Sequence, residues 1–352
     1  MIQPNDLNQS WPRPANLMPI VIFGAGSIVR DAHIPAYAAA GFPILGIFDP
    51  NKAKAQELAN QHGLTVFASA KQAAAQKGVV FDLATPPDAL AGILQILPRG
   101  ASVVMQKPMG STLEEATQIL HICRARALRA SVNFQLRFAP MMLALRDAID
   151  RGMLGEVVDV DAWVALDTPW GLWEFLDDLP RVEILLHSIH YLDFIRSILG
   201  DPTGVHAKTV GHPKDTISNT RTAAILDYGD HVRCALSINH NHAFGRKHQA
   251  CEFRICGTRG AAYVQMGVNL DYPRGEPDIL EINTDNGWED IPLQGSWFPE
   301  SFAHRMAQVQ RFASGEDDTL ISSVEDAWHT MALVEAAYES SAAPATRLAR
   351  IP

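Results

Sequence analysis

Short apolar runs alternate with longer mixed segments over the first 138 residues of the chain. The runs have the length and composition of strands buried on both faces, and the segments between them have helical composition. Expected strands are 19–23, 44–48, 64–67, 79–84, 102–105 and 131–134, and expected helices are 52–61, 89–97 and 113–127. Because a parallel strand pair needs a crossover helix, this alternation predicts a doubly wound parallel α/β sheet.

From residue 156 onward apolar positions alternate with polar ones, as in Cys251, Phe253 and Ile255 against Glu252 and Arg254. This period of two is typical of an antiparallel sheet with one buried and one wet face. Expected strands are 156–166, 223–228, 232–241, 250–255 and 261–265, with turns at 257–260 and 284–287 and helices at 182–199, 300–313 and 324–340. We therefore predict a second, α+β domain built on a large, mainly antiparallel open sheet.

The chain length also favours two folding units, because 352 residues exceed the ~250–300 at which a single core stops growing. The pattern changes near residues 138–140. We expect a polar N-terminal tail at 1–18, a first domain at 19–138 and a second domain at 139–352.

Composition places the chain among globular proteins, with 47% hydrophobic and 19% charged residues and a mean hydropathy of −0.02. The net charge of −10 argues against a nucleic-acid partner, whose binding depends on phosphate neutralisation. No apolar run reaches the ~18–20 residues that span a bilayer, and residues 1–18 lack the features of a secretion signal. We expect a cytoplasmic protein without membrane contact. The four cysteines form no CxxC pair, which argues against a zinc ribbon.

A glycine-containing loop, Gly24-Ala25-Gly26-Ser27-Ile28, joins the first strand to a helix. The first glycine allows a tight turn, and the second lets backbone N–H groups approach a pyrophosphate at the helix N-terminus. The match is partial, because a valine stands where the third glycine of the dinucleotide fingerprint belongs. A glycine pair alone also suits any tight turn. The position between strand and helix favours a dinucleotide site that includes Gly24, Gly26, Ser27 and Ile28.

Asp49 closes the second expected strand, where an acidic side chain accepts hydrogen bonds from ribose hydroxyls and repels a 2′-phosphate. We therefore expect NAD in preference to NADP, although Lys52 is close in sequence. Thr85 and Pro86 follow the fourth strand and Lys107 follows the fifth, at the edge where open α/β sheets bind ligands. We place these three residues beside the cofactor, and Lys107, which precedes a proline, is the candidate functional ammonium.

The order of these segments resembles that of the Gfo/Idh/MocA oxidoreductases. The similarity runs from Pro19 to about Ala343 and rests on the ordered motifs GAGSIVRDAHIPAY, FDPN, ATPP, QKP, VNFQLRFAP, HSIHYLD and SVEDAWHTMALVEAAYES. The resemblance implies a Rossmann domain, a second domain on a large sheet that forms subunit contacts, and NAD(P)-dependent chemistry on a sugar, inositol or polyol carbon. It also implies that Lys107 matches the lysine of the family's Glu-Lys-Pro motif and that His190 matches the histidine of its Asp-x-Gly-x-His motif.

Four positions depart from the family's pattern. Leu186 and Ser188 stand at the Asp and Gly positions of the histidine motif. Gln106 stands in place of the usual Glu, and Leu90 stands where many members have a histidine. Substrate contacts that the family's Asp supplies must therefore come from other side chains.

Glu183 and His187 are the nearest candidates, because they share a helix face with His190 at i, i+4 and i+7. A salt bridge between Glu183 and Arg181, and a packing role for His187, explain the same residues equally well. The three side chains are also of types that bind zinc. However, their order is not the HExxH arrangement, and we rank a metal site below redox chemistry.

Trp170 and Trp173 lie in a loop just before the histidine helix. Their aromatic faces suit stacking on sugar C–H surfaces, so we predict a substrate wall, with the packing of a lid as the alternative. We expect Trp163, inside a strand, to belong to the core, and His240 to belong to a solvated or interface sheet face. Arg137, at the end of the sixth strand, is a candidate substrate contact, although an interdomain ion pair explains it better.

Together these residues predict hydride transfer between the nicotinamide and a carbinol carbon of a sugar-like substrate. His190 would act as acid and base, and Lys107 would polarise the oxygen. Two alternatives stay open: a NAD-dependent glycosidase that acts by transient oxidation and elimination, and a non-catalytic dinucleotide-binding sensor. The expected partners are a small sugar-like molecule and further copies of the chain, in a homodimer or homotetramer formed through the C-terminal sheet.

Overall fold

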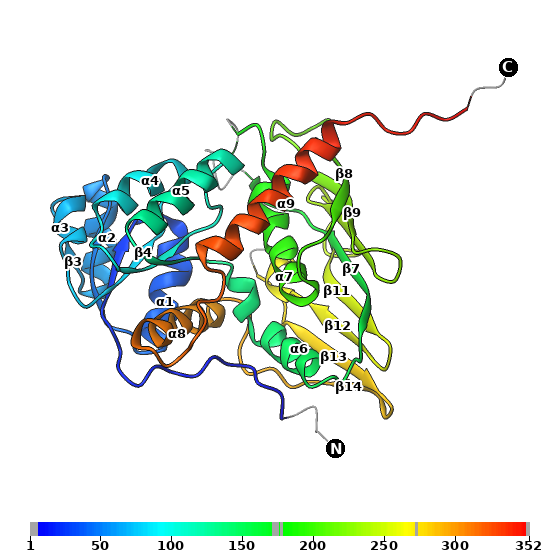
Figure 1. Ribbon diagram of the computed structural model, residues 1–352, viewed down its shortest axis with the longest axis horizontal. Helices are drawn as coiled ribbons and strands as arrows, with labels where there is room; N and C mark the ends of the chain where they lie inside the picture. The colour runs from blue at the N-terminus through cyan, green and yellow to red at the C-terminus, as the bar shows by residue number, and fades with distance from the viewer. Residues whose placement is uncertain (1–5, 171–175, 177–178, 272–273, 350–352) are drawn as a thin grey trace.

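The computed structural model describes residues 6–170, 176, 179–271 and 274–349. Two α/β halves stand side by side, each built on its own sheet (Figure 1). The first sheet has six strands and the second has eight. This arrangement confirms the predicted fold class, a doubly wound parallel sheet followed by a mainly antiparallel one.

The first sheet is parallel throughout, with the strand order β3-β2-β1-β4-β5-β6. Its strands are β1 (Ile20–Phe23), β2 (Ile44–Phe48), β3 (Thr65–Val66), β4 (Val80–Leu83), β5 (Ser102–Met105) and β6 (Arg129–Val132). Its helices are η2 (Val29–His33), α1 (Ile34–Ala39), α2 (Lys52–His62), α3 (Ala70–Ala74), α4 (Pro87–Ile96) and α5 (Leu113–Ala125). The direction of winding reverses between β1 and β4, so the carboxyl ends of these strands border the crevice where such sheets bind ligands.

Side chains cap the helices that cross over this sheet. Asn51 accepts hydrogen bonds from the first backbone N–H groups of α2, Ser69 does the same for α3 and Thr112 for α5. Each cap satisfies a donor that the helix itself leaves free, and such a cap contributes ~1 kcal/mol. Every residue of β1, β4 and β5 is buried, as strands covered on both faces require.

The second sheet has the order β14-β13-β12-β11-β7-β10-β9-β8. Its strands are β7 (Val157–Ala165), β8 (Gly204–Val210), β9 (Arg221–Asp227), β10 (Arg233–Asn239), β11 (Ala250–Gly257), β12 (Ala261–Gln265), β13 (Ile279–Thr284) and β14 (Gly287–Asp290). The β7–β10 pair is parallel, and the other pairs of named strands are antiparallel. Helices α6 (Pro140–Asp150), α7 (Ile189–Leu199) and α9 (Val324–Ala342) cover the face toward the first sheet (Figure 1).

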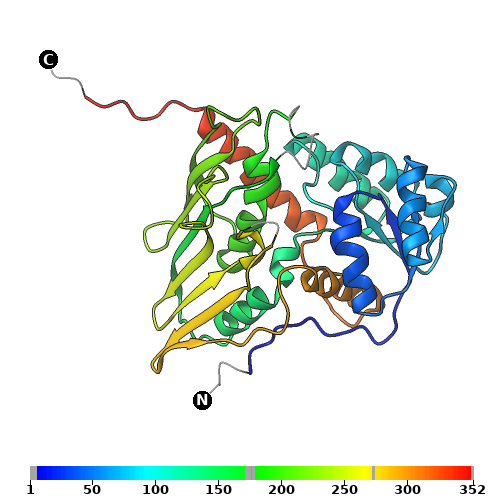
Figure 2. The ribbon, with the colours of Figure 1, turned by 180° about the vertical axis from the view of Figure 1, so that it is seen from behind.

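None of the described helices lies on the opposite face of the second sheet (Figures 1 and 2). Trp163 is 44% exposed there and Ile225 is 54% exposed, so the expectation that Trp163 belongs to the core is wrong. Along β7 the buried positions are Ala162 and Val164, and the alternation of the strand turns Trp163 outward. The Arg254 guanidinium lies 5.8 Å from the centre of its ring.

Helix α8 (Glu300–Ser314) returns to the first sheet and lies beside α1 (Figure 1). Phe302, Met306 and Val309 are buried in the same cluster as the residues of β1 and α1. The ring of Phe302 lies 4.9 Å from that of His33. Residues beyond the predicted boundary near 138 therefore complete the core of the first half, which a division by sequence position does not show.

The expected polar tail is docked on the protein in its described part. Leu7 and Gln9 are buried, and Gln9 Nε2 donates to the Pro292 carbonyl oxygen at 2.9 Å. Farther along, the Met18 N–H donates to Gln310 Oε1 at 2.8 Å. The segment therefore runs from the second half to the first, as the dark blue trace in Figure 1 shows.

The sixth strand differs most from its prediction among the strands of the first sheet. It covers Arg129–Val132 and not 131–134, because Asn133 and Phe134 are buried in the connection to a 3-10 turn, η3 (Gln135–Phe138), and not in a strand. An apolar run alone does not separate these two forms. Arg137 thus lies on this turn. The sequence pattern also misses α6, β8, β13 and β14. No described helix is both long and apolar enough to cross a bilayer.

Candidate active site

The glycine loop closes against the connection between β4 and α4. Gly24 has a φ of +110°, and a Cβ at this position would lie 2.2 Å from the Ala84 carbonyl oxygen, so both conformation and space require glycine. The Ala25 N–H donates to Asp49 Oδ2 at 2.7 Å, and the Asn51 N–H donates to Asp49 Oδ1 at 2.7 Å. Asp49 is therefore fixed at the end of β2, with further lone pairs that suit ribose hydroxyls.

The loop is open to the outside at Gly26 and Ser27, as close approach of a dinucleotide requires. Gly26 has no heavy atom within 4 Å of the place where a Cβ would stand, and both Gly26 and Ser27 are exposed. Ile28 follows them at the N-terminus of the helix, whose free N–H groups suit a pyrophosphate. Across the crevice, Pro86 precedes the first residue of α4. Beside it, Thr85 Oγ1 is buried without a hydrogen-bond partner among the described residues.

Lys107 lies directly after β5 and reaches the histidine helix of the second half. Its Nζ donates a hydrogen bond to the Leu186 carbonyl oxygen at 2.7 Å. Among the described residues it forms no ion pair, and burial lowers the pKa of Lys107 to about 8. The acceptor is thus a backbone oxygen, at the position where the family's motif has Asp.

His190 lies in the first turn of α7 and is 7% exposed. Its ring meets those of Phe134 and Trp297 edge-on, with centres 6.4 and 6.1 Å away. Its Nδ1 is buried and has no hydrogen-bond partner among the described residues. Burial, and then the charge of Lys107, lower the pKa of His190 well below its ordinary value. The imidazole is therefore neutral at pH 7 and able to accept a proton.

Three aromatic side chains pack together beside these two residues. The ring of His187 lies 5.0 Å from that of Trp170 and 4.6 Å from that of His240. Burial, followed by the charges of His240 and Lys107, lowers the pKa of His187 well below its ordinary value. His240 Nε2 in turn lies 3.6 Å from Glu183 Oε1. The structure thus brings together Trp170 and His187, two of the predicted substrate contacts.

Glu183 begins a π-helical turn, η6 (Glu183–Ser188), and its side chain is fully buried. Its carboxylate accepts hydrogen bonds from the hydroxyls of Ser188 and Thr222. Arg181, the expected ion-pair partner, pairs with Glu335 at 2.8 Å. Both oxygens of the Glu183 carboxylate are therefore engaged by the protein.

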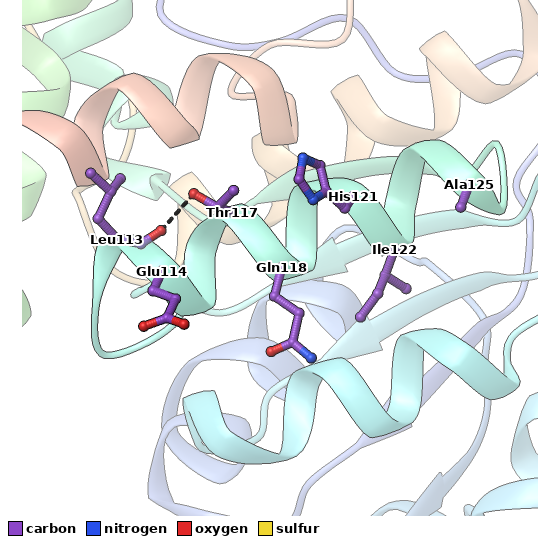
Figure 3. Close-up of a pocket in the computed structure, with 7 residues that line it drawn as sticks. All are labelled: Leu113, Glu114, Thr117, Gln118, His121, Ile122 and Ala125. Atoms are coloured by element: carbon purple, nitrogen blue, oxygen red, sulfur yellow. Dashed lines mark hydrogen bonds between the residues drawn. The ribbon is translucent and has the colours of Figure 1, made fainter.

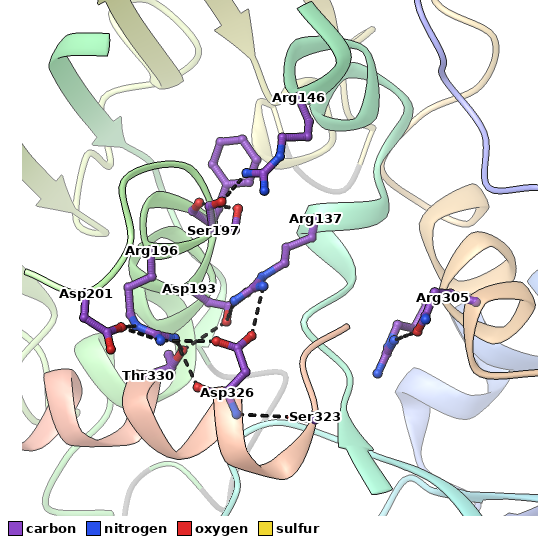
Figure 4. Close-up of polar contacts among 12 residues, drawn as sticks. Arg137, Arg146, Asp193, Arg196, Ser197, Asp201, Arg305, Ser323, Asp326 and Thr330 are labelled. Atoms are coloured by element: carbon purple, nitrogen blue, oxygen red, sulfur yellow. Dashed lines mark hydrogen bonds and ion pairs between the residues drawn. The ribbon is translucent and has the colours of Figure 1, made fainter. Parts of the chain in front are cut away.

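Arg137 belongs to a polar network that joins η3, α7 and α9 (Figure 4). Its guanidinium donates two hydrogen bonds to Asp193, at 2.5 and 2.6 Å, and lies 3.0 Å from Asp326. The Thr330 hydroxyl also donates to Asp193, at 3.0 Å. Arg137 therefore forms an ion pair across the boundary between the halves, and we leave it out of the proposed substrate contacts.

Two residues of this site are not among the predicted site residues. His240, expected on a solvated or interface face, is 1% exposed, because it continues the buried register of β10 at positions 234, 236 and 238. This period was a usable signal. Trp297 comes from the loop before α8, where its backbone N–H donates to Asp278 Oδ2 at 2.6 Å. Its indole Nε1 is buried and has no hydrogen-bond partner in the described chain. The predicted contact Trp173 lies outside the described residues.

Two other kinds of site were considered. Within the described ranges, no three His, Cys, Asp or Glu side chains are grouped so as to hold a metal ion. A groove of about 770 Å³ runs along α5 and is lined by Leu113, Glu114, Thr117, Gln118, His121, Ile122 and Ala125 (Figure 3). None of the candidate site residues lines this groove, so it is separate from the site at Lys107.

Comparison with known proteins identifies the family. Residues 18–134 match an oxidoreductase family with an NAD-binding Rossmann fold, and residues 142–263 match the GFO/IDH/MocA C-terminal domain. The chain belongs to the GFO/IDH/MocA oxidoreductases. This match confirms the resemblance found in the sequence and the expected dinucleotide-binding fold.

Relatives and solved structures agree with this membership. Inositol 2-dehydrogenase of Rhizobium meliloti (strain 1021) is 25% identical over 91% of this chain and 96% of its own. D-apiose dehydrogenase of Rhizobium rhizogenes (strain K84) is 24% identical over 68% and 70%. An oxidoreductase from Agrobacterium radiobacter, solved with NAD+, L-tartaric acid and magnesium, superposes with a TM-score of 0.78 at 21% identity over 93% and 97%. At this identity the structural likeness establishes the fold.

Proposed function

We propose that this GFO/IDH/MocA protein transfers hydride between a nicotinamide dinucleotide and a carbinol carbon of a sugar, polyol or sugar derivative. The main support is that Lys107, from the end of β5, meets the helix that carries His190 in the second half. The Lys107 charge also contributes, after burial, to the low pKa of His190, and so helps to keep that imidazole neutral. The names of the relatives, an inositol and an apiose dehydrogenase, support the substrate class.

His190 is the proposed acid and base. Its neutral imidazole takes the hydroxyl proton during oxidation and returns it during reduction. Lys107, as an ammonium, donates a hydrogen bond to the same oxygen and stabilises the negative charge that develops on it. When bound, the dinucleotide supplies the hydride acceptor or donor at its nicotinamide ring. The burial of His190 and the partial burial of Lys107 strengthen these interactions by limiting their contact with water.

The proposed substrate wall consists of Trp170, His187 and Trp297. The two tryptophans offer aromatic faces to sugar C–H groups and N–H donors that lack partners in the described chain. Glu183 is proposed to support this wall and not to touch substrate, because the protein engages both of its carboxylate oxygens. It acts through His240, which packs against His187.

We propose NAD as the preferred cofactor, because the Asp49 carboxylate lies where a 2′-phosphate of NADP would stand. A 3-ketoreductase from Actinomadura kijaniata, solved with NADP, superposes with a TM-score of 0.72 at 19% identity, over 92% of this chain and 98% of that chain. The fold therefore accommodates either cofactor. The residues proposed to hold the dinucleotide are Gly24, Gly26, Ser27, Ile28, Asp49, Thr85, Pro86 and Lys107.

We further propose a homodimer or homotetramer assembled through the open face of the second sheet. Trp163 and Ile225 expose large apolar side chains there, and such exposure marks contact surfaces. Light scattering of the wild type and of Trp163→Glu tests this assembly, since loss of the contact would lower the measured mass. A cytoplasmic location is also proposed, because all four cysteines are free thiols.

The function is tested by an NADH absorbance and fluorescence screen of sugars, lactones, inositols and aryl glycosides. Wild type is expected to form NADH with at least one of them, and both Lys107→Met and His190→Asn are expected to lose this turnover. His190→Asn should bind NADH as wild type does, and Lys107→Met should still bind it, more weakly, through the other residues of the cofactor site. Cleavage of an aryl glycoside without net NADH would indicate the glycosidase alternative. Binding of NADH with no turnover across the panel would indicate a sensor. Undiminished turnover in Lys107→Met would contradict the assigned role.

A further inference from the structure

Gln106 connects the candidate catalytic lysine to the helix that begins at the glycine loop. Its Nε2 lies 3.0 Å from His33 Nε2, and its Oε1 accepts the Lys107 N–H at 3.2 Å. His33 is the last residue of η2, the turn that follows the glycine loop. One carboxamide therefore bridges the end of β5 and the cofactor-facing helix.

Asp82, from β4, lies on the other side of the imidazole. Its Oδ2 lies 2.6 Å from His33 Nδ1 and accepts the Tyr37 hydroxyl at 2.8 Å. His33 and Asp82 are fully buried, and Tyr37 is 2% exposed. A buried carboxylate requires donors, and the Tyr37 hydroxyl and His33 Nδ1 supply two to Oδ2, while Oδ1 has no partner among the described residues.

The partners determine where the protons of this network lie. Because Gln106 Oε1 accepts the Lys107 N–H, Gln106 Nε2 faces His33 and donates to it. His33 Nε2 therefore carries a lone pair, and the ring proton is on Nδ1, where it donates to Asp82. The reverse orientation of the amide would set its NH₂ group against the Lys107 N–H, one donor against another. A carboxylate at position 106 would instead need a proton on His33 Nε2, and hence an imidazolium.

We infer that Gln106 is a positioning residue for Lys107, which it holds through a neutral, Nδ1-protonated His33 anchored on Asp82. This inference rests on the proposed function, since it concerns the delivery of the lysine to substrate. It also gives a physical consequence to the presence of Gln106 in place of the Glu of the family's Glu-Lys-Pro motif. The contact between residue 106 and His33 is uncharged here and would be an ion pair with a glutamate. Placement matters because a 1 Å error at a reacting group can cost ~10²-fold in rate.

The first test is the protonation state of His33, measured by NMR on protein with ¹⁵N-labelled histidine. Wild type is expected to show a neutral ring protonated on Nδ1, and Gln106→Glu is expected to show both ring nitrogens protonated. Gln56→Glu, the same change on an exposed position of α2, is the matched control and should leave the His33 signal unchanged. A wild-type His33 that is charged, or protonated on Nε2, would overturn the inference.

The second test is kinetic. Gln106→Leu is expected to lower kcat by ~10²-fold with KM and the thermal midpoint little changed, because a misplaced lysine weakens transition-state contacts. Gln106→Glu is expected to have a kcat between that of Gln106→Leu and that of wild type. It is also expected to move the alkaline limb of the pH profile above that of wild type. The groups that face Lys107 are His187 and His190, and both are neutral at alkaline pH because their pKa values are lowered, so they do not oppose that move.

Wild-type kcat in a folded Gln106→Leu variant would overturn the positioning role. The proposed function fails by a different result, undiminished turnover in Lys107→Met. The protonation state of His33 is measured without any turnover, so the two failures can be told apart.

Discussion

Lys107 Nζ lies 2.7 Å from the Leu186 carbonyl oxygen, and this hydrogen bond joins the end of β5 to the helix that carries His190. A neutral carbonyl stabilises an ammonium less than a carboxylate does, which agrees with the lowered pKa of Lys107. The ammonium therefore retains two N–H donors for a substrate oxygen. Because this contact uses the backbone of residue 186, it does not depend on which side chain stands there.

The pH dependence of kcat/KM should be bell-shaped. Activity needs Lys107 protonated and His190 neutral, so the rate falls as pH rises through about 8, where Lys107 loses its proton. On the acid side the rate falls only below pH 6.5, because burial and the Lys107 charge lower the pKa of His190. Lys107→Arg should move the alkaline limb upward. A rate that stays constant from pH 7 to 10 would contradict the role of Lys107.

Lys107→Met should stabilise the protein while it removes activity. Burial lowers the pKa of Lys107 from 10.5 to about 8, so the folded state holds the ammonium at a cost of ~1–3 kcal/mol. This cost is fully present below pH 8 and disappears as pH rises through 10.5, where the unfolded chain also loses the proton. Urea unfolding at pH 7 and pH 10 measures the difference. Lys54→Met, at an exposed position of α2, is the control and should change the free energy of unfolding by less than ~0.5 kcal/mol.

Two glycines of the same loop should respond differently to alanine. Gly24→Ala should destabilise the fold by several kcal/mol, on the order of 2–4, because φ is +110° and the new Cβ would lie 2.2 Å from the Ala84 carbonyl oxygen. Gly26→Ala should leave the thermal midpoint unchanged, since nothing lies within 4 Å of its Cβ position, and should weaken NADH binding. Calorimetry and fluorescence titration separate the two effects. Undiminished NADH affinity in Gly26→Ala would place the cofactor elsewhere.

Arg137→Ala should destabilise the protein by ~3 kcal/mol or more, because it leaves the fully buried Asp193 without its bidentate partner. The matched control is Arg124→Ala. The Arg124–Glu325 pair is 57% and 48% exposed, so its loss should cost less than ~1 kcal/mol. If Arg137→Ala raised KM for substrate at unchanged stability, the side chain would be a substrate contact after all.

The sequence predicts the two sheets well because their periodicities differ. Buried parallel strands such as 102–105 and half-exposed strands such as 261–265 have the bounds that the structure gives them. The sixth strand is shifted because Asn133 and Phe134 are buried in the connection to η3, where burial gives the same signal as a strand. The prediction for Trp163 is wrong because this large apolar side chain occupies an outward-facing position of β7, whereas apolar side chains usually face the core.

The site could be predicted in part, because Lys107 and His190 lie in motifs that a single chain displays. Their partners could not be predicted from local pattern. Trp297 comes from a loop far along the chain. Leu186 contributes its carbonyl oxygen, and the identity of a side chain does not predict a contact made by the backbone. For His240, the buried register of β10 was available as a signal, although histidine is a frequent surface residue.

Hydride transfer from a substrate carbon can be followed with an isotope label. The substrate found in the screen is prepared with deuterium on its carbinol carbon and incubated with NAD+, and the dinucleotide is examined by mass spectrometry. The account predicts NADH that carries one deuterium, with a slower single turnover, and no label when Lys107→Met is used. Turnover that leaves the dinucleotide unlabelled would contradict it.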